Sequence, residues 1–190
     1  CALPIWLLAP ALAANAAAQG VAAAVPVAVF GQPVDVGAWD ELAEKTGLRV
    51  VIDAAGAIGD QQIGRRAGVM VSLHATKPLP AGEGGLFAAA DAAWVDRVRQ
   101  LSNFGFAGGL SVYPAGNAKM SEYHAAAALA GLEGWPRRAW RLRRLAAAYS
   151  RALDRLDGRA VLPAGHRPWV RTTLVVRLAG ASTERVAEAL

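Results

Sequence analysis

The stretch that decides the fold is VAAAVPVAVFGQPVDVGAWDELAEKTGLRVVID, residues 21–53. Its apolar run over residues 21–30 predicts a strand that is covered on both faces, as in a parallel sheet. Between residues 35 and 45, apolar side chains recur every three to four positions, which predicts an amphipathic helix. Gly47 is placed to end this helix in a left-handed conformation, and residues 48–52 form the next apolar strand. A strand, a helix and a strand in this order indicate an α/β fold.

The same alternation continues toward the C-terminus. Apolar runs predict short strands over residues 69–73 and 85–89, and helical spacing predicts helices over residues 92–101 and 121–132. Gly134 and Pro136 interrupt the helical pattern, and further elements follow them: a long basic amphipathic helix over residues 137–156 and a strand over residues 172–178. We therefore expect part of a large α/β domain over residues 1–134 and the start of a small α/β domain over residues 135–190.

The composition narrows the class of protein. A chain of 190 residues with 54% hydrophobic and 18% charged residues can bury a core, which excludes a disordered chain. The single cysteine, Cys1, excludes a disulfide framework and favours the reducing cytoplasm. His124 and His166 have no metal-ligating neighbours at useful spacing, so we predict no metal site.

The N-terminal segment is rich in alanine over residues 3–18 and resembles the apolar part of a leader peptide. However, Pro4 and Pro10 break it below the length that spans a bilayer, and no basic residue precedes it. A buried helix is the simpler interpretation, and we expect no membrane association. Because the chain starts with Cys1 instead of Met, we also expect it to be a piece of a longer protein.

A basic run of seven arginines between residues 137 and 155, interleaved with Trp135 and Trp140, raises the alternative of a nucleic-acid-binding module. The same stretch carries an apolar stripe that we expect to be buried against a core, and no known nucleic-acid-binding motif surrounds it. We therefore interpret it as a solvated helix face and expect no nucleic-acid partner.

Two residues, Asp53 and Lys77, are the candidates for a catalytic or ligand-binding role. Asp53 directly follows a buried strand, at the edge where α/β sheets bind their ligands. Lys77 lies in the loop between the strand at residues 69–73 and the Gly-rich turn at residues 82–85. Taken alone, an aspartate there is often a turn former and a loop lysine is often solvated. Together they match the requirements of pyridoxal 5'-phosphate (PLP), which needs a lysine for a Schiff base and a carboxylate that keeps the pyridine nitrogen protonated.

Four ordered blocks strengthen this hypothesis: residues 25–60 (VPVAVFGQPVDVGAWDELAEKTGLRVVIDAAGAIGD), 71–87 (VSLHATKPLPAGEGGLF), 101–106 (LSNFGF) and 116–133 (GNAKMSEYHAAAALAGLE). In order and spacing they resemble the DegT/DnrJ/EryC1/StrS family of PLP-dependent sugar aminotransferases. The resemblance extends over about residues 21–178 and matches only the middle and later part of a family member.

The resemblance implies a fold-type I transferase with a three-layer α/β large domain. Lys77 would carry the cofactor, Asp53 would pair with the pyridine nitrogen, and Ser72 would bind the cofactor phosphate. Asn117 would reach across a homodimer interface toward the neighbouring subunit's phosphate, so the active site would be shared. The implied reaction transfers an amino group from an amino acid, with glutamate the expected donor, to a keto group of a nucleotide-linked sugar.

One departure from the family pattern leaves an alternative open. The family usually has Gln or His three residues after the aspartate, to lie against the cofactor ring, and this chain has Gly56. A PLP-binding but catalytically silent relative therefore remains an alternative. Sugar dehydratases of the same family replace the lysine with histidine, and Lys77 argues against that activity.

Overall fold

The computed structural model describes residues 11–14, 20–155, 160–161, 169–178 and 180, so most of the helix predicted within residues 3–18 lies outside these ranges. The described helical segments are residues 11–14, the 3-10 helix η1 (Val29–Gly31), α2 (Val36–Thr46), α3 (Ala92–Ser102), α4 (Glu122–Glu133) and α5 (Trp135–Asp154). The strands are β1 (Ala23–Ala24), β2 (Arg49–Asp53), β3 (Gly68–Ser72), β4 (Gly85–Ala88), β5 (Phe106–Ala107), β6 (Leu110–Ser111), β7 (Ala160–Val161) and β8 (Arg177–Leu178).

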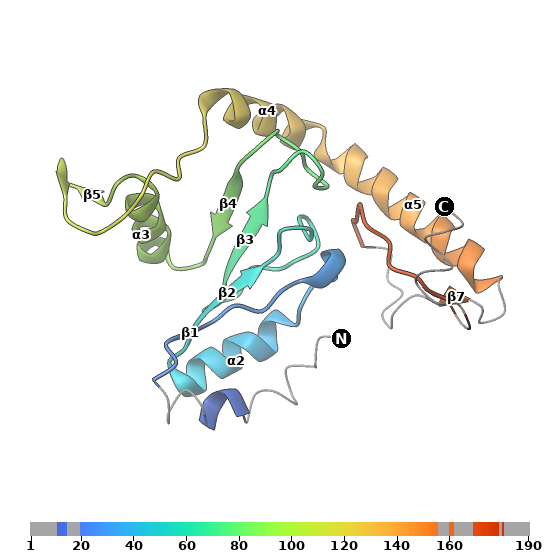
Figure 1. Ribbon diagram of the computed structural model, residues 1–190, viewed down its shortest axis with the longest axis horizontal. Coiled ribbons are helices and arrows are strands. Elements are labelled where there is room, and N and C mark those ends of the chain that lie inside the picture. The colour runs from blue at the N-terminus through green and yellow to red at the C-terminus, as the bar shows by residue number, and fades with distance from the viewer. Residues whose placement is uncertain (1–10, 15–19, 156–159, 162–168, 179, 181–190) are drawn as a thin grey trace.

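A four-stranded sheet in the order β1-β2-β3-β4 forms the centre of the fold (Figure 1). β1 pairs with β2, and β2 with β3, in parallel, whereas β4 runs antiparallel to β3. Helix α2 connects β1 to β2, and the predicted α/β class is confirmed.

Helix α2 begins and ends where the sequence indicates. The side chain of Asp35 accepts hydrogen bonds from the backbone N–H groups of Gly37 and Ala38, which caps the first turn. Gly47 has a φ of 73° and donates its N–H to the carbonyl of Ala43, as expected for a left-handed C-terminal cap. The helix is therefore shifted by one residue toward the C-terminus relative to the predicted range 35–45, and the predicted cap at Gly47 is confirmed.

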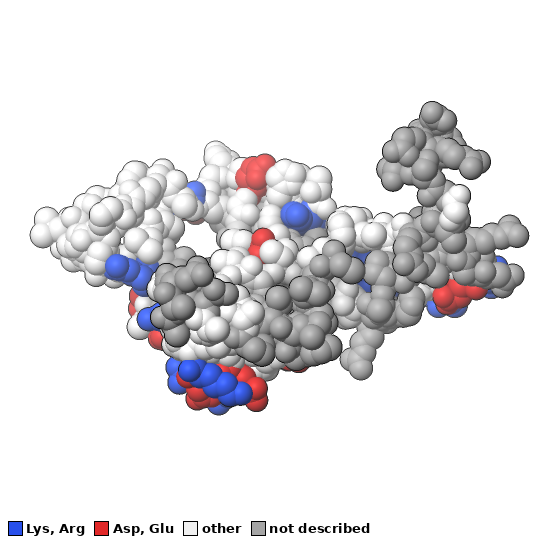
Figure 2. Space-filling view, turned by 60° about the horizontal axis from the view of Figure 1, so that its bottom comes forward, with Lys and Arg blue, Asp and Glu red and all other residues white. Residues whose placement is uncertain are grey.

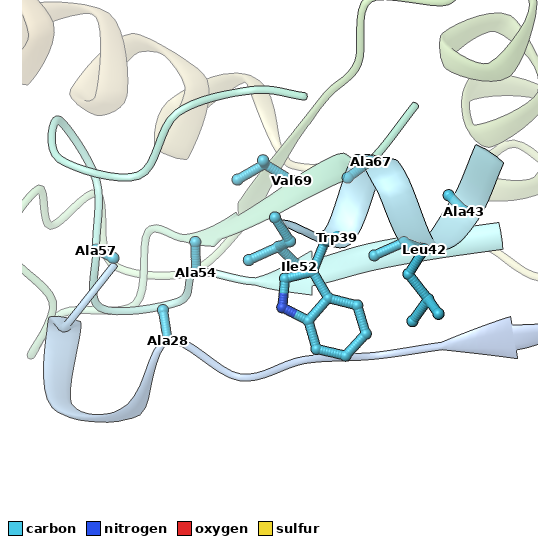
Figure 3. Close-up of a cluster of buried hydrophobic side chains, with 10 residues drawn as sticks. Ala28, Trp39, Leu42, Ala43, Ile52, Ala54, Ala57, Ala67 and Val69 are labelled. Carbon is cyan, nitrogen blue, oxygen red and sulfur yellow. The ribbon is translucent and has the colours of Figure 1, made fainter. Parts of the chain in front are cut away.

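The main core lies between α2 and one face of the sheet (Figure 3). Trp39 and Leu42 of α2 are buried in the same cluster as Val50, Ile52 and Val69 of the strands, and both Val50 and Ile52 are completely buried. Because strand side chains alternate between faces, this burial fixes which residues of β2 point away from the helix. Asp53 is one of them, since it is adjacent to Ile52.

The prediction of a strand covered on both faces over residues 21–30 is wrong. Only Ala23 and Ala24 form a strand, and β1 is the edge of the described sheet. Val25 is 61% exposed and Val27 is 50% exposed. An apolar run specifies a preference for burial, but the position of a strand in the sheet decides whether neighbours cover it.

Other predictions differ from the structure in detail. The strand expected over residues 172–178 is limited to Arg177–Leu178. The basic helix begins earlier than expected, at Trp135, because Pro136 is accommodated in its first turn. The division into domains at residue 134 remains a prediction. Among the described helices, none is long and apolar enough to cross a membrane.

A buried carboxylate fixes the loop that leads into β3. Asp40 on α2 is 6% exposed, and its side chain accepts hydrogen bonds from the backbone N–H groups of Arg65, Arg66 and Ala67 at 2.7–3.0 Å. Burial raises the pKa of Asp40, but these hydrogen bonds and the nearby charge of Arg65 together lower it by more, so the net pKa lies below its usual value. The carboxylate therefore stabilises the folded chain in its ionised form.

We predict that Asp40→Asn lowers the free energy of unfolding by about 2 kcal/mol at neutral pH, because the amide places a donor against backbone donors. Since the folded pKa of Asp40 is below the unfolded one, this stabilisation is present above the usual aspartate pKa of 3.8 and is lost as the pH falls through the folded value. Denaturant unfolding of both proteins between pH 7 and pH 3 measures the difference. Glu44→Gln, on the exposed side of the same helix, is the control and should change stability by under about 0.5 kcal/mol. Equal stability of Asp40→Asn and wild type at pH 7 would contradict the prediction.

Candidate cofactor-binding site

The parallel pairing of β2 with β3 brings the two predicted chemical residues to one cavity. β2 ends at Asp53 and β3 ends at Ser72, and parallel strands end at the same edge of a sheet. A cavity of about 470 Å³ lies at this edge, and Asp53 and Lys77 both line it. Its other lining residues are Val27, Ala28, Val29, Phe30, Gly31, Ala55, Gly56, Thr76, Thr172 and Thr173.

Asp53 is held at the cavity by its own backbone. Its N–H donates to the carbonyl of Pro26 and its carbonyl accepts the N–H of Ala28, both at 2.8 Å. Its carboxylate Oδ1 accepts the N–H of Ala55 at 3.0 Å, which sets the direction of the side chain. An acidic group in a fixed direction therefore lines the cavity.

The loop after β3 carries Lys77. Its backbone N–H donates to the carbonyl of His74 at 2.9 Å, and the following Pro78 is fully buried. The other lysines of the sequence are engaged elsewhere: Lys45 pairs with Glu41 at 3.4 Å, and Lys119 Nζ donates to Asn103 Oδ1 at 2.8 Å. Lys77 is the lysine that lines the cavity.

The remaining two predicted residues do not line this cavity. The hydroxyl of Ser72 accepts the N–H of His74 at 3.2 Å, at the start of the loop that leads to Lys77. Asn117 is exposed and forms a bridge with Asn103 near the β5–β6 hairpin, which projects away from the central sheet (Figure 1). Within one chain, the structure thus brings together Asp53 and Lys77 and leaves Asn117 apart.

Several lining residues had no signal in the sequence. Thr172 and Thr173 reach the cavity from the far end of the chain, and Thr172 Oγ1 donates to the carbonyl of Thr76 at 3.2 Å across 96 positions. Phe30 lines the cavity with a φ of 54° and is 56% exposed. A left-handed conformation is unusual for a bulky residue and is often found at functional sites.

Two glycines at the cavity touch each other through their backbones. A Cβ built on Gly31, whose φ is 82°, would lie 2.7 Å from the carbonyl oxygen of Gly56. A Cβ on Gly56 would instead meet Gly31 at 3.5 Å or more, which is an ordinary contact. Gly31 is therefore required by the fold, whereas Gly56 leaves room for a Cβ atom.

The charges of the chain are mixed on the surface that Figure 2 shows, where Lys and Arg side chains lie beside Asp and Glu. Two arginines of the basic helix α5 bind the body of the protein: Arg138 donates to the carbonyl of Pro78, and Arg143 pairs with Asp60 at 2.7 Å. Among the described residues, no group of three potential metal ligands lies together.

The fold is that of PLP-dependent aminotransferases in solved structures. The chain aligns with DesI, crystallised in the presence of its TDP-sugar product, with a TM-score of 0.74 and 31% identity over 93% of this chain and 48% of that one. It aligns with Streptomyces venezuelae DesV, crystallised with a ketimine intermediate, with a TM-score of 0.73 and 27% identity over 88% of this chain and 47% of that one.

The sequence comparison agrees with the structural one. The model of the DegT/DnrJ/EryC1/StrS aminotransferase family matches residues 3–190, so the chain belongs to this family. It is 35% identical to the dTDP-3-amino-3,4,6-trideoxy-alpha-D-glucose transaminase of Streptomyces venezuelae, in an alignment that covers 78% of this chain and 41% of that protein. It is also 36% identical to the dTDP-4-amino-4,6-dideoxy-D-glucose transaminase of Shigella dysenteriae, in an alignment that covers 58% of this chain and 32% of that protein. The chain thus spans less than half of these curated relatives.

The residues at the cavity fit PLP in their chemistry. Lys77 offers an amine for the cofactor aldehyde, and Asp53 offers a carboxylate for the ring nitrogen. Thr76, Thr172 and Thr173 add three hydroxyl groups. The volume lies within the range of small-molecule sites.

The contact between the two glycines gives a testable asymmetry. We predict that Gly31→Ala destabilises the protein by more than about 2 kcal/mol, because the new Cβ collides with backbone and the left-handed φ adds strain. Gly56→Ala should cost less than about 1 kcal/mol. Thermal unfolding of both variants checks this, and a Gly56→Ala variant as unstable as Gly31→Ala would refute the geometry.

Proposed function

We propose that the protein carrying this chain is a PLP-dependent aminotransferase that transfers an amino group from an amino acid to a keto group of a nucleotide-linked sugar. The observation that carries the proposal is the shared cavity of Asp53 and Lys77. The sugar-transaminase names of the relatives support the substrate class. We expect glutamate as the donor and the cytoplasm as the location.

Lys77, Asp53 and Ser72 have separate roles in the proposed reaction. When bound, PLP supplies an electron sink for the carbanion that forms at the amino-acid Cα. Lys77 Nζ would hold the cofactor when no substrate is bound, and its free amine would take up the proton that leaves the amino-acid Cα. The Asp53 carboxylate keeps a proton on the pyridine nitrogen, and its bond from Ala55 fixes its direction. Ser72 is proposed to bind the cofactor phosphate.

A homodimer with a shared active site is part of the proposal. Asn117 is exposed and separate from the cavity of its own chain. The segment before it exposes large apolar side chains, which a partner subunit would cover: Phe104, Phe106, Leu110 and Val112. These features support a role for Asn117 at the partner's cofactor phosphate.

The second candidate function, a PLP-binding protein without transaminase activity, is favoured by Gly56. This residue lines the cavity without a side chain, so it offers no side-chain contact to the cofactor ring. This second function would be preferred if the protein binds PLP but does not aminate any keto sugar.

We predict that Lys77→Ala abolishes the visible absorbance of the bound cofactor and lowers transamination by at least about a thousandfold, because the amine that links to PLP and moves the proton is gone. Asp53→Asn should retain cofactor and lose about a hundredfold or more in kcat, since the amide does not hold the ring nitrogen protonated. Absorbance spectra and glutamate-dependent amination of nucleotide-linked keto sugars measure both effects. Lys45→Ala removes a lysine that pairs with Glu41 and should match wild type. A coloured, active Lys77→Ala enzyme would disprove the assignment.

The shared site has its own test. We predict that Lys77→Ala and Asn117→Ala homodimers are each impaired and that mixing them under subunit exchange restores activity. In each mixed dimer, one of the two sites then contains both an intact Lys77 and an intact Asn117. Activity is measured before and after exchange, and wild type mixed with Lys77→Ala is the control, because exchange leaves its number of complete sites unchanged. Absence of recovery, despite demonstrated exchange, would argue that Asn117 serves its own chain.

A further inference from the structure

Three segments that are far apart in the sequence meet at Asp60. This residue ends the turn that follows Asp53, and its side chain is 13% exposed. Its Oδ1 pairs with Arg143 of α5 at 2.7 Å, and its Oδ2 accepts the backbone N–H of Val170. These partners are 83 and 110 positions away in the chain. One carboxylate therefore joins the turn after β2, helix α5 and the C-terminal segment.

The segment held by Asp60 supplies one wall of the cavity. Val170 is fully buried, and its carbonyl oxygen lies 3.4 Å from the position of a Cβ on Gly31. Thr172 and Thr173 follow two and three residues later and line the cavity. Val170 is thus fixed on one side by Asp60 and packed on the other against Gly31, and the position of the two threonines depends on it.

The charge of Asp60 is satisfied from several sides. Arg143 also donates to the carbonyl of Gly59 at 3.3 Å, so the guanidinium binds the turn at two points. Burial lowers the pKa of the neighbouring Arg171, and the negative charge of Asp60 offsets part of this effect. Hydrogen bonds to a charged acceptor are stronger than neutral ones, and a buried charge is tolerated only when it is paired. Removal of this one charge therefore weakens the contacts of all three segments.

We propose that Asp60 is a positioning residue: it holds residues 170–173 as the wall that completes the cavity around Asp53 and Lys77, and it thereby sets how firmly the cavity retains its ligand. Asp60 does not line the cavity itself, so it acts through Val170. The inference rests on the proposed function for the identity of the ligand as PLP, whereas the arrangement of Asp60 stands on the contacts alone.

The test compares Asp60→Asn with wild type in two measurements on the intact gene product. Hydrogen exchange of peptides covering residues 169–173, measured without PLP, should be about tenfold faster in Asp60→Asn, because the charged acceptor of the Val170 N–H is lost. The rate at which bound PLP dissociates should rise about tenfold as well. Asp40→Asn is the matched control, since it removes a buried carboxylate with backbone donors away from the cavity. It should lower overall stability without a selective change in residues 169–173.

A second variant keeps the test decisive if Asp60→Asn does not fold. Arg143→Gln changes a side chain that is 40% exposed, and we expect the same two effects with smaller size. In the double variant, the effects should be less than additive, because both residues act through one contact. Unchanged exchange and unchanged PLP release in folded Asp60→Asn or Arg143→Gln would overturn the proposal. A wild type that binds no PLP would refute the proposed function instead, and the exchange measurement would still decide the role of Asp60.

Discussion

The parallel pairing of β2 with β3 is the constraint on which the site depends. Val51, Ile52 and Asp53 pair with Gly68, Val69 and Met70, so both strands reach the same edge of the sheet. The burial of Ile52 against α2 then determines the direction of its neighbour Asp53. At the start of β3, the backbone just before the strand donates to the side chain of Asp40 on α2, which fixes where β3 begins. The loop with Lys77 starts from this fixed position.

Much of the fold could be predicted from local pattern. The helix that ends at Gly47 was identified because its apolar spacing and its C-terminal glycine are local features of the sequence. Asp53 and Lys77 could be singled out for a similar reason, since each follows a strand that is apparent in the sequence. Their meeting at one cavity follows from the parallel pairing of these strands.

Long-range features could not be predicted in this way. The run over residues 21–30 was expected to be covered, yet its cover depends on which strands lie beside β1, and that information is not local. Thr172 and Asp60 were missed because their partners are about a hundred positions away. The β5–β6 hairpin was overlooked although Gly108 and Gly109, both with positive φ, form its turn.

The basic helix gains a structural explanation. Two of its arginines brace the loops that flank the cavity: Arg138 binds the carbonyl after Lys77, and Arg143 binds the turn after Asp53 through Asp60. An excess of positive charge that suggested nucleic-acid binding therefore includes residues that hold the candidate site together. The expected apolar stripe of this helix is not buried in the part of the chain that the structure describes: Ala139 and Ala146 are buried, whereas Trp140, Leu145 and Tyr149 are about half exposed.

The most direct measurement is to trap the cofactor on the protein. Borohydride reduction of the PLP-loaded gene product makes the link between the cofactor and its lysine permanent, and peptide mass mapping then identifies the residue. We predict that the pyridoxyl group is found on Lys77. Labelling of Lys45 or Lys119, with Lys77 unmodified, would contradict the assignment of the cavity as the cofactor site.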